Sequence, residues 1–260
     1  MTAAQPDDLV RYEAADGVAE LTLNRPSEAN AIDLETAHAL KTNVERAASD
    51  DSVNVVLLLG AGQRFCGGGD LAAMAASADR SDYLAELAGT AHDAIRALDT
   101  VAKPVVAGVQ GAAAGIGLSL VLGADLVVAG ASAKFVTAYT SVGLTPDGGQ
   151  SWLLPRIVGQ RRALELILTS APLTATRAEE WGIVSTVCDD DDVVATARQA
   201  AASLAARPAQ ALGAARSLVR QSWDRPLNEQ LDVEAASISY AVGTPESTAL
   251  VDRFVTKRYP

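Results

Sequence analysis

Hydrophobic and polar positions repeat with different periods along the chain, and each period predicts a different element. Residues 9–14 and 18–23 alternate between the two kinds and flank Asp16-Gly17, a strong turn pair, so they predict a β-hairpin. Residues 53–60, VNVVLLLG, are mostly branched and apolar and predict a strand that is covered on both faces.

Helical periodicity separates further apolar segments. Apolar residues recur at helical spacing over residues 33–48, where Asp33 can cap the first turn. After a second helical stretch the chain continues as strand, helix and strand, over residues 79–98, 104–109, 115–122 and 125–129. Buried strands divided by helices predict a mostly parallel sheet with crossover connections.

The last third of the chain is mainly helical in pattern. From about residue 159 only a short segment, 183–187, could form a strand. Pro and Gly residues bound the remaining helical segments, which cover residues 193–206, 209–221, 227–242 and 246–258. The sequence therefore predicts an α/β core followed by helices.

One uncharged run is long enough to be considered as a membrane span. Residues 104–124 carry no charge and match the length of a bilayer span, but five glycines and Gln110 interrupt the run. We interpret it as a buried strand, a turn and a buried helix in a layered core. The first eight residues, MTAAQPDD, lack the basic and apolar regions of a secretory signal, so neither membrane insertion nor export is expected.

Composition narrows the classes of partner. Hydrophobic residues make up 49% and aromatic residues only 4%, which favours helices packed closely through small side chains. The net charge of −11 argues against nucleic acid as a partner, because phosphates require cations. Two separated cysteines and two isolated histidines provide neither a disulfide framework nor a metal site, and they predict a cytoplasmic protein.

Three glycine-containing turns follow predicted strands, where α/β sheets normally place ligands. The turn FCGGGDL, residues 65–71, offers backbone amides to an anion. The turn GAAAGIG, residues 111–117, opens a helix whose first amides are unpaired. The turn GLTPDGG, residues 143–149, places Asp147 before a helical segment. On local sequence alone, the first two could be packing turns and Asp147 a helix cap.

No Cys/His pair or Ser/His/Asp set competes with Asp147 as a reactive group in the sequence. His92 falls within a helical pattern, and we interpret it as a surface or core-edge histidine. Cys66, in the first glycine turn, is interpreted as a small apolar filler.

Five segments in order and spacing resemble one family. They are LTLNRPSEANAID (21–33), VVLLLGAGQRFCGGGDL (55–71), KPVVAGVQGAAAGIGLSLVLGADLVVA (103–129), FVTAYTSVGLTPDGGQSWLLPRIVG (135–159) and LTSAPLTATRAEEWGIVSTV (168–187). With them the chain resembles the crotonase, or enoyl-CoA hydratase/isomerase, superfamily over nearly its whole length.

The resemblance implies an α/β fold in which ββα units form a spiral with two roughly perpendicular sheets. Residues 1–195 would form this core, and residues 196–260 a C-terminal helical region that closes the pocket and builds trimers, or hexamers from paired trimers. The implied partner is an acyl-CoA thioester. Coenzyme A enters as part of the substrate, so no resident cofactor is expected.

In the family, two backbone amides hold the thioester oxygen, and motif position places them on Gly67 and Ile116. Each such donor typically contributes about 2.7 to 4 kcal/mol to the transition state. The cations expected to hold coenzyme A are Arg25, Arg64 and, from a neighbouring subunit, Lys257. The other implied contacts of the acyl-CoA are Ala29, Ala31, Gly68, Gly69, Asp70, Leu71, Gly115 and Tyr139.

Departures from the family pattern decide the expected reaction. Family hydratases use two glutamates, and Ser119 and Tyr139 stand at those positions here. Adding water needs one group to activate the water and another to deliver a proton, so this site should be a poor hydratase. Asp147 stands where several isomerases and the chlorobenzoyl-CoA dehalogenases place a catalytic aspartate. The dehalogenases tend to have a tryptophan at the position of Tyr139, which makes them the weaker match.

The sequence therefore predicts an enoyl-CoA isomerase in which Asp147 is the proton shuttle. Its substrate would be a 3-enoyl-CoA or the epoxide of a ring-containing acyl-CoA. Two alternatives stay open. A hydratase could work through Tyr139 or a bound water, and a catalytically silent homologue would bind acyl-CoA esters without exchanging the α-proton.

Overall fold

The computed structural model describes residues 9–258, so the MTAAQPDD segment lies outside the described residues. Two sheets form the core: six strands in the order β1-β2-β3-β4-β6-β9, and three in the order β5-β7-β8. The strands are β1 Val10–Ala15, β2 Val18–Leu23, β3 Val55–Gly60, β4 Val105–Val109, β5 Ala112–Ala114, β6 Leu126–Gly130, β7 Lys134–Val136, β8 Leu173–Thr174 and β9 Thr186–Cys188. Apart from the antiparallel β1–β2 pair, the larger sheet is parallel, as predicted.

The predicted hairpin is confirmed. Val10 lies opposite Leu23 and Ala15 opposite Val18. Asp16 and Gly17 both have positive φ, 51° and 79°, which is the backbone of a type I′ turn and matches the twist of the two strands.

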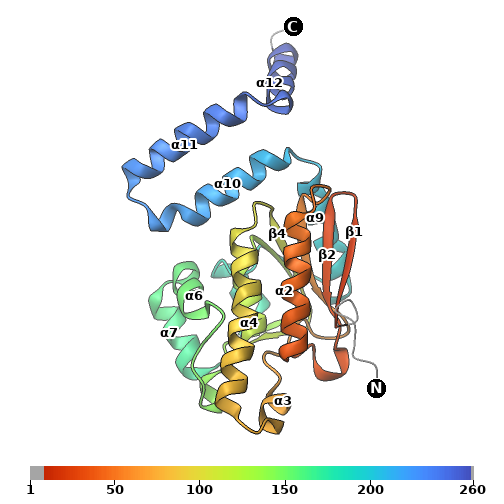
Figure 1. The fold of residues 1–260 in the computed structure, drawn as a ribbon, viewed down its shortest axis with the longest axis vertical. Coiled ribbons are helices and arrows are strands. Elements are labelled where there is room, and N and C mark those ends of the chain that lie inside the picture. The colour runs from red at the N-terminus through yellow and green to blue at the C-terminus, as the bar shows by residue number, and fades with distance from the viewer. Residues whose placement is uncertain (1–8, 259–260) are drawn as a thin grey trace.

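Helices cover both faces of the larger sheet. The α2 and α4 helices lie side by side over one face (Figure 1), and α9 packs its Ala197 and Ala201 against Leu57 and Val106 on the other. The helices are α2 Leu34–Ser49, α3 Leu71–Ala76, α4 Arg80–Thr100, α5 Ile116–Gly123, α6 Gln150–Val158, α7 Gln160–Thr169, α8 Ala175–Glu180, α9 Val193–Ala205, α10 Ala209–Gln221, α11 Leu227–Val242 and α12 Pro245–Arg258. Asp33 caps α2 as expected, because its side chain accepts the Thr36 N–H.

The resemblance implied a second sheet, and the structure has one, but local sequence did not reveal its strand β5. This strand lies inside the 111–117 segment that the sequence presents as a turn, and it pairs in parallel with β7. Three alanines have little intrinsic preference for a strand, so this pairing depends on the distant partner rather than on local sequence.

The layered core extends further along the chain than residue 195. The boundary between 195 and 196 falls inside α9, and α9 packs against the larger sheet. The change to helices that leave the sheets therefore comes after Ala205.

The uncharged run 104–124 contains β4, β5 and the eight-residue α5. Within residues 9–258, no helix is both long and apolar enough to cross a membrane.

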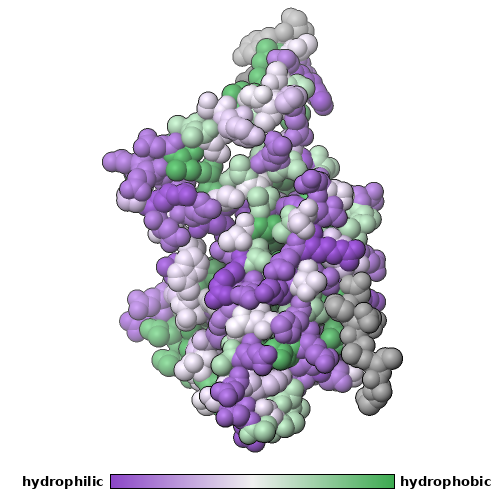
Figure 2. All heavy atoms as spheres, in the orientation of Figure 1, coloured by the Kyte–Doolittle hydropathy of each residue, from purple (hydrophilic) through white to green (hydrophobic). Residues whose placement is uncertain are grey.

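The α10, α11 and α12 helices extend away from the sheets towards the C-terminus (Figure 1). Hydrophobic residues lie among hydrophilic ones on the surface of this part (Figure 2). They include Leu227, Ile238, Tyr240 and Phe254, each more than half exposed.

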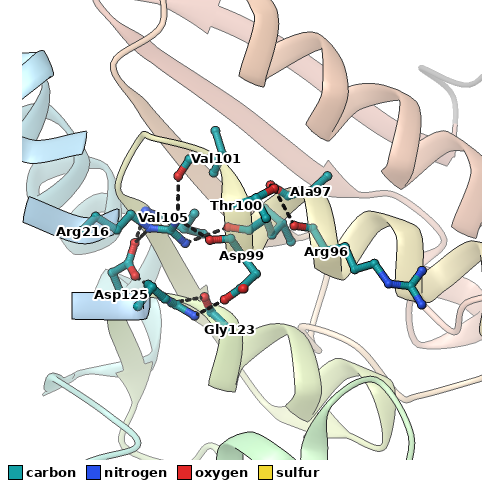
Figure 3. A network of polar contacts seen from close by, with 11 residues as sticks. Arg96, Ala97, Asp99, Thr100, Val101, Val105, Gly123, Asp125 and Arg216 are labelled. Carbon is teal, nitrogen blue, oxygen red and sulfur yellow. Dashed lines mark hydrogen bonds and ion pairs between the residues drawn. The ribbon is translucent and has the colours of Figure 1, made fainter. Parts of the chain in front are cut away.

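A buried arginine joins α10 to the core. The Arg216 guanidinium lies at the C-terminal end of α4 and donates to the carbonyls of Leu98, Asp99 and Val101 (Figure 3). It also pairs with Asp125 Oδ2 at 2.6 Å, and its side chain is only 5% exposed. The free carbonyls that end α4 are thus satisfied by a cation, which is favourable at a helix C-terminus.

Candidate active site

The 65–71 turn is held by pairing with the segment before α2. Ile32 donates its N–H to Gly68 O, and Asp70 donates its N–H back to Ile32 O. Arg25 clamps the two segments together, because its guanidinium bonds Ala31 O and the Asp70 carboxylate. The guanidinium also lies 3.2 Å from Asp33 Oδ2. Arg25, predicted as a ligand of coenzyme A, is therefore engaged in internal ion pairs.

The structure corrects the predicted role of Gly67. Its N–H donates to Ala29 O at 2.8 Å, so this amide is not available to a thioester oxygen. Gly69 differs, since within the described part of the chain its N–H has no hydrogen-bond acceptor. In an extended segment the N–H of one residue points opposite to that of the next. Asp70 N–H faces Ile32, so Gly69 N–H faces away from it.

The second turn ends where predicted. Gly115, at φ 51°, precedes the first residue of α5, which is Ile116. The amide of that first residue has no partner inside the helix and lies at the positive end of the helix dipole. No acceptor for Ile116 N–H is found among residues 9–258.

The third turn places Asp147 between α4 and α5. Asp147 O accepts bonds from Ser119 Oγ at 3.2 Å and from Gln150 N–H. On the other side of the same peptide group, Gly148 N–H donates to His92 Nε2 at 3.0 Å. Gly148 and Gly149 have φ 60° and 77°, which favours glycine at both positions. The peptide that follows Asp147 is thus fixed at its oxygen and at its nitrogen.

The Asp147 carboxylate has one engaged and one free oxygen. The Tyr139 hydroxyl donates to Oδ1. Burial, and then the negative charge of Asp147, raise the pKa of Tyr139 well above its usual value, so the phenol stays a donor. Among residues 9–258, Oδ2 accepts no hydrogen bond, and its one ion-pair contact is with His92, at 3.9 Å between Nε2 and Oδ2.

His92 lies at the edge of the core, as interpreted, with its side chain 33% exposed. Its contact with the Asp147 turn was missed. The Nε2 atom is the acceptor of the hydrogen bond from Gly148 N–H, so it is Nδ1 that can carry the imidazole proton. Positions 92 and 148 are 56 residues apart in the sequence, so no local pattern predicts this contact.

One pocket brings most of the predicted site together. Gly69, Ile116 and Asp147 line it. Other predicted site residues around it are Gly67, Gly68, Asp70, Leu71, Gly115 and Tyr139. The rest of the wall is mostly apolar and includes Ile32, Met74, Leu84, Leu87, Ala91 and Leu144. Such a wall, with few polar groups, suits a small-molecule substrate.

The remaining predicted residues lie outside this pocket. Ala29 and Ala31 belong to the segment that pairs with the first turn, and Arg64 is exposed beside that turn. Lys257 is on α12, at the opposite end of the molecule from α3 (Figure 1). Within one chain, Lys257 is therefore remote from the pocket.

Two further groups near the pocket are unsuited to chemistry. Burial opposes ionisation of Asp70, but its bonds to Ala73 N–H and Arg25 outweigh this effect and hold the pKa of Asp70 below its usual value. Burial raises the pKa of Cys66 to about 12, which leaves an unreactive thiol. Its interpretation as an apolar filler is confirmed by its complete burial.

Comparison with known proteins identifies the family of the chain. The sequence pattern of one family, enoyl-CoA hydratase/isomerase, matches residues 13–260. This chain belongs to the enoyl-CoA hydratase/isomerase family. The fold is the crotonase fold of that family, and the family acts on acyl-CoA thioesters.

Relatives within the family differ in activity. The chain is 37% identical to the 1,2-epoxyphenylacetyl-CoA isomerase of Escherichia coli, over 94% of each chain. It is 33% identical to 4-chlorobenzoyl coenzyme A dehalogenase-1 of Arthrobacter sp, over 98% of this chain and 93% of the relative. The crystal structure of an enoyl-CoA hydratase from Polaromonas sp. JS666 superposes with a TM-score of 0.91 at 32% identity, over 96% and 98% of the chains.

Proposed function

We propose that this family member is an enoyl-CoA isomerase with Asp147 as its single proton shuttle. The observation that carries the proposal is the free Oδ2 of Asp147. Within the described residues, the pocket wall has two carboxylates, Asp70 and Asp147. Both oxygens of Asp70 are engaged, by Ala72 and Ala73 N–H and by Arg25, so Asp147 alone is able to take a proton from a bound substrate.

The thioester oxygen binds between the amides of Gly69 and Ile116, which replaces the predicted pair of Gly67 and Ile116. Asp147 Oδ2 removes a proton from the carbon next to the thioester or conjugated to it. The electron pair of that C–H bond moves to the thioester oxygen, and the two amides stabilise the enolate. The same carboxyl then returns the proton to another carbon, which shifts the double bond.

Tyr139 supports this cycle from the opposite oxygen. Its hydroxyl orients the Asp147 carboxylate, and its raised pKa prevents it from acting as a base. A hydratase would need a second carboxylate, and the two positions that could supply one are occupied by Ser119 and Tyr139. The substrate is a 3-enoyl-CoA or a ring-epoxide acyl-CoA, and similarity to the 1,2-epoxyphenylacetyl-CoA isomerase supports the second class. No resident cofactor is required.

The test is mass spectrometry of acyl-CoA esters incubated with the protein in heavy water. A 3-enoyl-CoA should gain deuterium and isomerise without gaining the mass of water, and Asp147→Asn should abolish both changes. Asp93→Asn is the matched control, because Asp93 lies one residue beyond His92 on α4, outside the pocket, and pairs with Lys41. Its activity should match that of the wild type.

Two results would reject the proposal. A hydrated product that persists in Asp147→Asn would make the chain a hydratase by another route. Tight binding of esters without any deuterium exchange would make it a silent acyl-CoA binder.

We also propose that α11 and α12 assemble with other copies of the chain into a trimer or a pair of trimers. The exposed apolar side chains of these helices, such as Leu227, Ile238 and Phe254, support this proposal. A neighbouring copy would also be the source of Lys257 near coenzyme A. Light scattering coupled to gel filtration tests the assembly, and a monomeric mass at micromolar concentration would reject it.

A further inference from the structure

A second cavity lies behind the pocket. It has a volume of about 250 Å³, and its wall comes from α4, α5 and α6, with Arg220 of α10 at its edge. Most of this wall is apolar, including Ile95, Leu120, Trp152 and Leu153. The cavity takes no part in the proposed reaction.

The two cavities occupy successive turns of the same helices. On α4, Leu87 and Ala91 line the pocket, and Ile95 lines the second cavity. On α5, Ile116 lines the pocket and Ser119 the second cavity. Residues three or four apart share one face of a helix, so the same faces of α4 and α5 run past both cavities.

Residues between the two sets of lining residues mark where the cavities approach each other. Asp147 lines the pocket and Gly149 the second cavity, so Gly148 lies between them along the chain, and its N–H donates to the His92 imidazole at 3.0 Å. A Cβ atom added to Gly148 would lie 2.9 Å from Ser119 Cβ and 3.1 Å from Ile116 Cδ1, so the turn is already packed tightly against α5. We call His92, Gly148 and Ser119 the partition.

We propose that the partition ends the acyl pocket and sets the length of acyl chain that the protein accepts. The second cavity is the space that a longer acyl tail would enter if the partition were open. This inference rests on the proposed binding of an acyl thioester in the pocket. It concerns binding of the acyl tail and not the proton transfer, so the two can be tested separately.

The physical expectation follows from burial of methylene groups. Each CH₂ that leaves water for an apolar cavity should tighten binding about fourfold. With the partition closed, affinity should stop rising once the pocket is full. With it open, affinity should continue to rise as further methylenes enter the second cavity.

The experiment measures dissociation constants by calorimetry for hexanoyl-, octanoyl-, decanoyl- and dodecanoyl-CoA, which are saturated and cannot react. His92→Ala should open the partition and extend the rise in affinity to the longer esters. Gly123→Leu in the same protein should cancel that gain by filling the second cavity. Gly123 lines this cavity, and a Cβ there would have no atom within 4 Å.

Gly123→Leu alone is the matched control and should leave the wild-type series unchanged. If it weakens binding of the long esters to an otherwise wild-type chain, the cavities are already continuous and the inference is wrong. An unchanged series in His92→Ala, or one that Gly123→Leu does not reverse, also overturns it. His92→Val, which leaves a smaller void, replaces the alanine variant if the latter does not fold.

The results separate this inference from the proposed reaction. A chain-length limit that responds to His92→Ala in a protein without isomerase activity would keep the partition and reject the reaction. Isomerase activity together with a chain-length limit that neither variant changes would keep the proposed reaction and reject the partition.

Discussion

The two sides of the pocket are built in different ways. The 65–71 turn is positioned by backbone bonds, such as those between Gly67 and Ala29 and between Ile32 and Gly68. The turn that carries Asp147 is positioned by side chains from distant elements, among them Ser119 and His92. The amide side therefore depends on conformation, whereas the carboxylate side depends on side chains and on the placement of α4 and α5.

This difference predicts how substitutions should affect each side of the pocket. Substitutions that keep the backbone and the Arg25 clamp should be tolerated on the amide side, because the groups offered to the substrate there are backbone N–H groups. On the carboxylate side, a change in a remote side chain or in the anchoring of a helix should be felt at Asp147.

The largest effect is expected at the anchor of α4. Arg216→Met should lower the free energy of unfolding by about 3 to 5 kcal/mol, because it leaves the buried carbonyls and part of Asp125 without their cation. Denaturant unfolding measures this loss of stability. Arg198→Met is the control, since Arg198 is 58% exposed and its pair with Glu20 should contribute below about 1 kcal/mol. Equal losses in the two variants would show that α10 does not anchor α4.

The next effect tests the amide side. Gly69→Pro removes one N–H, and kcat of the proposed isomerase should fall about 10² to 10³-fold. Gly69→Ala keeps the N–H and has space for its Cβ, with no atom within 4 Å, so its loss should be far smaller. Steady-state kinetics with a 3-enoyl-CoA decides. Similar losses in both variants would mean that the Gly69 amide is not the donor.

A smaller effect is expected at Tyr139. Tyr139→Phe deletes the donor to Asp147 Oδ1, and kcat should fall about tenfold, because a hydrogen bond to a charged group is lost. KM should change little, since the hydroxyl faces the carboxylate. Tyr83→Phe serves as the control on α4. If Tyr139→Phe kept the wild-type kcat, the phenol would have no role in the mechanism.

The smallest effect is spectroscopic. Burial and then the charge of Asp147 raise the pKa of Tyr139, so its phenol should remain protonated at a pH where an ordinary phenol ionises. The free energy that this phenol contributes to stability is complete below pH of about 10, where the unfolded chain begins to ionise, and declines as pH rises further. In an alkaline titration followed by tyrosinate absorbance, the step at the highest pH should be missing in Tyr139→Phe. If a step at lower pH is missing instead, the pKa of Tyr139 is not raised.

Much of the fold could be predicted from the sequence because its signals are local. The Asp16-Gly17 turn, the apolar run of β3 and the Asp33 cap each depend on neighbours in the chain. The strand β5 could not be read from local sequence, because it is three alanines whose strand conformation comes from pairing with β7. The packing of α9 on the sheet is likewise a tertiary contact that local sequence does not reveal.

The sequence predicted which turns form the site, but it did not predict which atoms in them are free to bind a substrate. Glycine motifs and Asp147 identified the pocket wall, and the structure brings them together. Motif position selected Gly67, yet its amide is taken by Ala29 O, and hydrogen-bond direction cannot be read from glycines alone. His92 was invisible as a site residue because its partner Gly148 is a backbone amide far along the chain.

The contact of Ser119 with the Asp147 turn limits how this enzyme could change its chemistry during evolution. A glutamate at position 119 would restore one hydratase carboxylate, but it would remove the hydroxyl that holds Asp147 O and would meet the Gly148 backbone. The gain of one catalytic group would therefore disrupt the other. We therefore expect a two-carboxylate layout to require a compensating change in the 146–149 turn.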